Sequence, residues 1–225
     1  MLALVLVAAA IAAWLYHRRT TRPGPGASAA ARARQLRTPT VRIATALGIP
    51  TQRGREADRS EAGAVGEQRT AARLAPLARE GWIILHDRAL PHGRANVDHL
   101  VVSPTGIVIM PDSKLWTSRY QLRLVNGRLL HGTWDVTRRL DSARYEAAAV
   151  SDALGVPVIP LISMDGPPIP AGELVVDGLL IVPADRLCVV LRDLNRTRGH
   201  RRGADPAALA DRAEHLLPPY TRRHR

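Results

Sequence analysis

The sequence predicts a mixed α/β domain in which a central sheet is flanked by helices. Its patterns run in the order helix, three or four strands, helix, two strands and helix, an order typical of α/β and α+β folds. Apolar residues make up 46% of the 225 residues and phenylalanine is absent, so the core is expected to be sizeable and aliphatic. This length fits one domain with appendages.

The N-terminus is apolar. Residues 1–16, MLALVLVAAAIAAWLY, carry no charge and are followed by His17-Arg18-Arg19. As a helix they would reach about 24 Å, a marginal length for a hydrocarbon core of about 30 Å. Because arginines follow the run, the rest of the chain is expected on the cytoplasmic side. We therefore predict a single-pass membrane anchor at 1–16 with the body facing the cytoplasm; the alternative is a buried or interfacial helix.

The net charge of +12 is concentrated in the flanks. Residues 1–60 carry ten arginines against two acidic residues, residues 196–225 carry eight against three, and the body at 61–195 is nearly neutral. The composition of 17–60 predicts a flexible basic linker, and 196–225 is predicted to be a basic arm with a helix. Basic flanks suit a nucleic-acid backbone or an anionic membrane, and charge alone does not choose between them.

The body begins near Glu61 with a helix over 61–80, kinked at Pro76. Asn126-Gly127 signals a hairpin turn further along the chain. The elements expected after the first helix are strands at 82–86, 96–103 and 107–112, a hairpin of 120–125 and 128–131, a helix at 141–154, strands at 156–163 and 174–182, and helices at 184–194 and 206–217.

The central hairpin brings two carboxylates together. Its loop, Ser-Pro-Thr-Gly at 103–106, suits a three-residue turn whose glycine takes the left-handed conformation. Pairing the first loop residue with Ile107 places Asp98 opposite Asp112. The two-residue period of a strand then puts Asp98, Asp112 and Lys114 on one face. Because opposed carboxylates repel, the two aspartates are expected to share a proton or to bind a cation.

Two further residues are candidates for chemistry. Lys114 is the one lysine beside 31 arginines, which indicates a site that needs a compact amine able to lose its proton; the alternative is chance in an arginine-rich sequence. Glu67 shares a helical stripe with Ala64, Ala71 and Leu74 that should face the sheet. A carboxylate there needs a partner, so Glu67 either forms a salt bridge with an arginine or belongs to the site.

Four short motifs occur in order along the chain. They are Gly66-Glu67-Gln68, Asn96-Val97-Asp98-His99, Pro104-Thr105-Gly106 and Asp112-Ser113-Lys114-Leu115-Trp116. Together they resemble the nuclease-related domain, NERD, a branch of the PD-(D/E)xK restriction-endonuclease-like superfamily. The resemblance covers 61–154 in motifs and extends to about 194 in element order, and it implies an αβββαβ core.

The resemblance also implies metal-dependent hydrolysis of DNA or RNA phosphodiesters. Asp98 and Asp112 would bind Mg²⁺, or Mn²⁺, Glu67 would assist from the helix, and Lys114 would orient and activate the attacking water. Mg²⁺ favours a couple of carboxylates, with water and phosphate oxygens as its other ligands. The alternative function is a catalytically weak module that binds nucleic acid or a protein near the membrane.

Some features depart from the family pattern or lie beside it. Pro111 removes a ladder donor, which predicts a bulge or an edge and an Asp112 turned from its expected position. The superfamily often supplies a glutamine from the following helix, and the helix around Glu146 has none. His99 points to the face opposite Asp98, where packing or a supporting hydrogen bond is expected. Cys188 is the one cysteine, so no intrachain disulfide forms.

Overall fold

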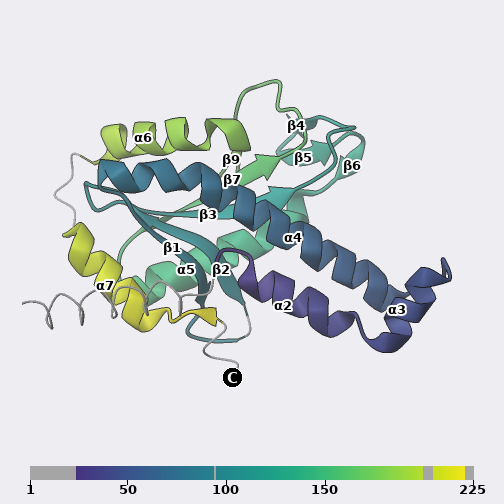
Figure 1. Cartoon of the computed structure of the whole chain (residues 1–225). Coiled ribbons are helices and arrows are strands. Elements are labelled where there is room, and N and C mark those ends of the chain that lie inside the picture. Colours follow the sequence, from purple (N-terminus) through teal and green to yellow (C-terminus); the bar gives the residue numbers. More distant parts are fainter. Residues whose placement is uncertain (1–23, 94, 200–204, 221–225) are drawn as a thin grey trace, which may run out of the picture.

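The computed structural model describes residues 24–93, 95–199 and 205–220. Its centre is a six-stranded mixed sheet in the order β1-β2-β3-β7-β9-β8 (Figure 1). The pairs β1–β2, β2–β3 and β8–β9 are antiparallel, whereas β3–β7 and β7–β9 are parallel. The strands are β1 Ile83–Ala89, β2 Asn96–Val102, β3 Val108–Leu115, β7 Val158–Asp165, β8 Leu174–Val176 and β9 Leu179–Pro183.

Helices cover both faces of this sheet, which confirms the mixed α/β fold (Figure 1). On one face, Val101, Ile109 and Leu161 pack against Leu74 of α4 and Leu191 of α6. On the other face, β-strand side chains pack against α5 and α7. Both cores are aliphatic, as the composition predicts. The helices are α4 Gln52–Leu74, α5 Asp141–Leu154, α6 Leu187–Arg198 and α7 Pro206–Leu216.

The segment before α4 differs from the flexible linker expected over 17–60. Within its described part, 24–60, the chain forms α2 Ala27–Leu36, α3 Pro39–Ala46 and the start of α4, and α2 lies along α4 (Figure 1). The alanine-rich α2 has high helix propensity, and Arg37 pairs with Asp58 and Glu61 of α4. The buried residues of α2 and the first half of α4 are small alanines such as Ala33 and Ala57, so these helices show no apolar period in the sequence.

The predicted membrane anchor at 1–16 lies outside the described residues. Within the described ranges, no helix has both the length and the apolar character needed to cross a bilayer.

Most expected elements form, with changes at their ends. The helix expected at 61–80 begins nine residues earlier, at Gln52, and passes at Ala75 into the 3₁₀ helix η1 Ala75–Glu80, next to the predicted kink. The strand expected at 174–182 is instead a hairpin of β8 and β9 around Asp177-Gly178, both with positive φ. The central hairpin keeps the predicted register: Val101 pairs with Ile109, and Gly106 has φ 80°.

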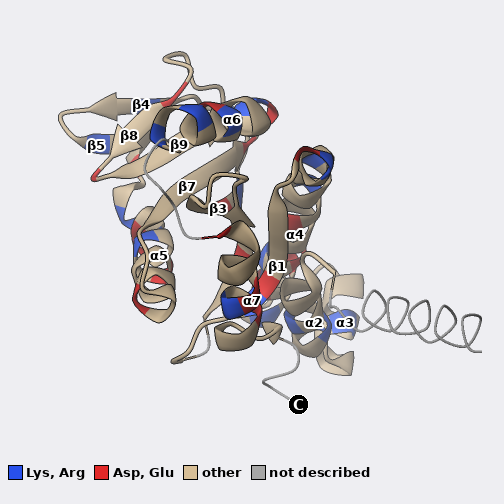
Figure 2. Cartoon of the chain, turned by 90° about the vertical axis from the view of Figure 1, so that its left-hand side faces the viewer, with Lys and Arg blue, Asp and Glu red and all other residues tan. Residues whose placement is uncertain are grey.

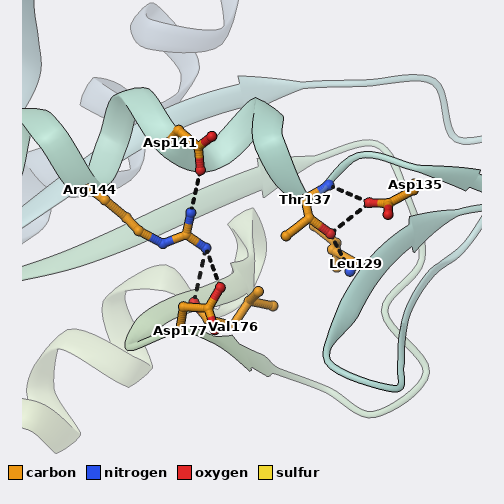
Figure 3. Close-up of polar contacts among 7 residues, drawn as sticks. All are labelled: Leu129, Asp135, Thr137, Asp141, Arg144, Val176 and Asp177. Atoms are coloured by element: carbon orange, nitrogen blue, oxygen red, sulfur yellow. Dashed lines mark hydrogen bonds and ion pairs between the residues drawn. The ribbon is translucent and has the colours of Figure 1, made fainter.

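A second, three-stranded sheet follows β3. It consists of β4 Leu122–Val125, β5 Arg128–His131 and β6 Trp134–Asp135, and the 3₁₀ helix η2 Thr137–Leu140 links it to α5. Thr137 fixes this link: its N–H and hydroxyl donate to Asp135 Oδ1, and its hydroxyl accepts from Leu129 N (Figure 3). The small sheet is thus held against the start of α5.

Candidate active site

The site forms where β2 and β3 separate. The hydrogen-bonded pairs of this hairpin recur at every second residue, and Val101 with Ile109 is the last regular one. The next would join His99 to Pro111, and proline has no N–H to donate. No ladder pair between the strands follows in the described part of the chain, whereas β3 stays paired with β7 to its end. Pro111 therefore opens the sheet between β2 and β3. The sequence predicted a bulge or an edge strand at this residue, but Pro111 lies inside a central strand.

The Asp98 carboxylate reaches across this opening. Its Oδ2 accepts a hydrogen bond from Ser113 N at 3.1 Å, and the Ser113 hydroxyl lies 3.2 Å from His99 Nε2. His99 is buried on the opposite face, and its Nδ1 lies 2.8 Å from Nδ1 of His86. Burial lowers the pKa of both imidazoles, that of His86 to about 4, so both are neutral and one Nδ1–H donates to the other. The expected supporting role of His99 is confirmed.

The structure brings all four predicted site residues together. Burial raises the pKa of Asp98 well above its usual value, and the neighbouring charges of Glu67 and Asp112 raise it further. The positive charge of Lys114 acts in the opposite direction. Charges influence one another this strongly when they are close and poorly solvated. Glu67, from α4, is therefore close enough to Asp98 for their charges to interact.

Asp112 and Lys114 form an ion pair on β3. Lys114 Nζ lies 2.5 Å from Asp112 Oδ2, and Asp112 is buried. Among the described residues, Oδ2 has no hydrogen-bond partner besides Lys114. Burial acts to lower the pKa of Lys114, but Asp112 and Asp98 outweigh it, and that pKa is raised. Pro111 has not turned Asp112 away, because its side chain meets that of Lys114.

Glu67 enters the site from α4 and is buried, as its helical position predicts. Among the described residues its Oε2 has no hydrogen-bond partner, and Glu67 pairs with no arginine. Burial and the nearby charge of Asp87 raise the pKa of Glu67 to about 7. A backbone hydrogen bond from Gly26 acts in the opposite direction and lowers this pKa. Asp87 is itself fully buried, and it accepts from Ser28 N at 3.1 Å and from Asn96 Nδ2 at 3.0 Å. The start of α2 thus borders the site.

Sequence reasoning missed one carboxylate, that of Glu146 on α5. Burial, with the charge of Asp112, raises the pKa of Glu146 to about 8, while Lys114 acts to lower it. A signal was available, because Glu146 stands three residues after Ala143 and four before Val150, which are both buried. These spacings put Glu146 on the face of its helix that packs against the sheet. The same kind of spacing predicts that Glu67 faces the sheet.

Arg144 fixes the helix that carries Glu146. Its guanidinium donates to Asp141 at 2.7 Å, to Val176 O at 3.3 Å and to Asp177 at 3.4 Å (Figure 3). These contacts join the first turn of α5 to the turn between β8 and β9. Arg144, two residues before Glu146, therefore ties this helix to the β8–β9 turn.

The carboxylates suit a magnesium ion by their chemistry. Within the described residues, no three His, Cys, Asp or Glu side chains form a ready metal-binding group. Mg²⁺ usually takes one or two protein carboxylates and fills its remaining positions with water and phosphate oxygens. Asp98 and Asp112 supply such a pair, and in the metal-free protein the Asp112 Oδ2 atom is engaged by Lys114 Nζ. Asp98 and Asp112 therefore fit Mg²⁺ as donors, with Glu67 beside them.

Comparisons with known proteins identify the part of the chain that holds the site. Searches among curated proteins and among solved structures find no match. The family model described as the nuclease-related domain, NERD, matches residues 62–164, a range that contains Glu67, Asp98, Asp112 and Lys114. Placement in the PD-(D/E)xK superfamily is consistent with a match to this family. The resemblance inferred from the motifs is confirmed over residues 62–164, which are similar to the nuclease-related domain.

Proposed function

We propose that this domain hydrolyses phosphodiester bonds of DNA or RNA with Mg²⁺, or with Mn²⁺, on a restriction-endonuclease-like core. One observation carries the proposal: Asp112 and Lys114 are in contact where the sheet opens between β2 and β3, and the charges of Asp112, Lys114 and Glu67 all act on the buried Asp98. The element order supports it, because α4, β1, β2, β3, α5 and β7 follow one another with the small sheet inserted after β3.

Asp98 and Asp112 would hold the ion, with Glu67 assisting from α4. Bound Mg²⁺ would offset negative charge on the phosphate and lower the pKa of a coordinated water. Lys114 would orient the attacking water: the water oxygen bonds to phosphorus, and the bond from phosphorus to one ester oxygen breaks. The carboxylates keep Lys114 protonated in the metal-free protein, so its amine can take the water proton only where their charge is neutralised.

Cleavage in the presence and absence of metal tests this proposal. The full chain is incubated with single- and double-stranded DNA and RNA in Mg²⁺, Mn²⁺ or EDTA. We expect cleavage of at least one substrate with either metal and none in EDTA. Asp98→Asn and Asp112→Asn should abolish it, whereas Asp152→Asn, an exposed change on α5, should not.

A second candidate function is a binding module on the same fold. The helix around Glu146 has no glutamine of the kind that the superfamily often supplies, and above its pKa of about 8 the Glu146 carboxylate adds negative charge beside Asp112, which disfavours a phosphate. Nucleic-acid binding without metal-dependent cleavage of any of the four substrates would support this alternative and contradict the nuclease.

We also propose that the chain is tethered to a membrane through residues 1–16, with the body in the cytoplasm. The tip of the α2–α4 arm supports this, because Ile43, Leu47 and Ile49 are each more than half exposed there. Arg42 and Arg53 are exposed beside them, and residues 24–55 contain no acidic side chain. Exposed aliphatic residues among arginines suit an anionic bilayer surface.

Fractionation tests the tether. The full chain should sediment with membranes and resist carbonate extraction, whereas a chain that starts at residue 24 should be released. In intact spheroplasts the body should be protected from added protease and should be digested after lysis. Carbonate release of the full chain would contradict the anchor, and digestion before lysis would contradict the cytoplasmic side.

A further inference from the structure

A continuous row of aromatic rings begins two residues after Lys114. Trp116 lies 5.5 Å from His131, His131 lies 5.8 Å from Tyr120, and Tyr120 lies 5.0 Å from Trp134, measured between ring centroids. The rings come from the end of β3 and from the small sheet. The whole chain contains only eight tryptophans and tyrosines, so three of them and a histidine in one row are a marked concentration.

Packing of the small sheet does not explain the outer end of this row. Leu122 and Leu129 are fully buried in the core beneath the small sheet, and Trp116 packs against that core. Trp134, by contrast, is 56% exposed. Its strand is held by the hydrogen bonds of the neighbouring Asp135 with Thr137 (Figure 3). Trp134 therefore presents a large ring to solvent from a fixed strand.

Arginines accompany the rings. The guanidinium of Arg139 lies 4.2 Å from the Trp116 ring centroid, and that of Arg119 lies 5.5 Å from the Tyr120 ring. Between residues 116 and 140 the chain carries five arginines and one acidic residue, Asp135. This part of an otherwise nearly neutral body is thus positively charged. It offers the exposed face of Trp134 and arginines that can pair with phosphate groups, whereas His131 is buried within the row.

We propose that this aromatic row, with Trp134 as its exposed ring, Tyr120 and Trp116 partly exposed, His131 buried between them and Arg119 and Arg139 beside the rings, is a binding platform for single-stranded nucleic acid. Unpaired bases stack on aromatic side chains while basic residues follow the backbone. Bases in a duplex are already stacked on one another and offer few free faces, so the platform selects single strands. Duplexes would meet only the arginines, whose attraction is not specific.

The row also continues from the proposed active site. Trp116 is two residues from Lys114, so their Cα atoms lie within about 7 Å of each other. A strand lying on the rings would therefore lead one of its phosphates toward Lys114. This alignment rests on the proposed hydrolysis, whereas binding of the strand to the row does not.

Binding measured in EDTA tests the platform independently of cleavage. Fluorescence anisotropy of labelled oligothymidylate and oligouridylate of about 16 nucleotides, and of a duplex of the same length, is measured with the full chain. We expect the single strands to bind more tightly than the duplex. Trp134→Ala should weaken single-strand binding about 5- to 100-fold, the range for loss of one stacked base, and should change duplex binding little.

Two further variants separate stacking from general damage. Trp134→Tyr keeps an aromatic face and should retain most of the affinity. Tyr145→Ala removes another exposed ring, on α5 outside the row, and should have no effect. A loss of affinity of Trp134→Ala for either oligonucleotide supports the platform, and the oligonucleotide affected shows whether the platform accepts DNA or RNA.

Other results would overturn the platform. These are unchanged affinity of Trp134→Ala for both single strands, an equal loss on the duplex, or an equal loss in Tyr145→Ala. Failure of the proposed hydrolysis gives a different result: no cleavage in Mg²⁺ while the Trp134→Ala binding loss remains. Circular dichroism and thermal melting of each variant verify that its fold is intact.

Discussion

Lys114 and Asp112 lie on one face of β3 with Nζ 2.5 Å from Oδ2. Successive side chains of a strand alternate between faces, so residues two apart meet in this way. Asp98 and Glu146 also raise the pKa of Lys114. The one lysine of the chain is therefore the cation that partly balances several carboxylates in the metal-free site, and a divalent cation would compete with it for Asp112.

Metal binding should stabilise the folded protein. A ligand that binds only the folded state at a hundred times its Kd adds about 2.7 kcal/mol to the free energy of unfolding. We expect Mg²⁺ to raise the melting temperature of the full chain above that in EDTA, because it relieves repulsion between Asp98 and Asp112. Asp98→Asn should lessen this rise, and Asp152→Asn should preserve it. Equal melting temperatures in millimolar Mg²⁺ and in EDTA would count against the site.

The metal-free protein should lose stability as the pH rises from about 6.5 to about 8. Burial raises the pKa of Glu67 to about 7 and that of Glu146 to about 8, from 4.5. In this window the folded state holds protons that the unfolded state has released, so stability falls with pH. His86 and His99, whose pKa values are lowered, act in the opposite direction only below about 6.5.

Glu146→Gln isolates one of these carboxyls. The variant cannot lose a proton at position 146, so its melting temperature in EDTA should fall less steeply over the same pH range. Thermal melts of the wild type and the variant at matched ionic strength measure the two slopes. Identical slopes would contradict a raised pKa for Glu146.

Docking of α2 beside the site can be tested at one glycine. Gly26 has φ 76°, and a Cβ there would lie 2.7 Å from Ala64 O. Gly26→Ala should therefore destabilise the protein by about 1 kcal/mol or more, and it should weaken the backbone hydrogen bond to Glu67. Urea denaturation measures the change. Gly24→Ala is the matched control, because a Cβ at Gly24 meets nothing within 4 Å; equal effects of the two changes would refute the docking.

Local chemistry made much of the site predictable. The loop at 103–106 sets the register of β2 and β3, and the two strands keep that register where they pair, at Val101 with Ile109. The 3.6-residue period of α4 likewise predicts that Glu67 faces the sheet. Both inferences need only short segments of sequence, and both agree with the structure.

Features that depend on contacts between distant segments escaped the sequence analysis. The helices of 24–60 are held by pairs such as Arg37 with Asp58, which no apolar period reveals. The aromatic row joins Trp116 to Trp134 through rings from separate strands, so its members are unremarkable in the sequence. Pro111 predicts a bulge or an edge in β3, whereas in the structure β2 separates from β3 at this residue, where its missing N–H ends their pairing.

Lys114→Arg tests the central proposal, that this site hydrolyses phosphodiesters, most directly. Arginine keeps the positive charge, but it is bulkier and stays protonated, so it cannot replace a compact amine that orients water or takes its proton. The measurement is the Mg²⁺-dependent cleavage rate of the variant and the wild type on the same substrate, with binding measured in EDTA. We expect cleavage to fall by about 10²- to 10⁴-fold while binding is retained. Equal cleavage by Lys114→Arg and the wild type would contradict the proposed role of Lys114.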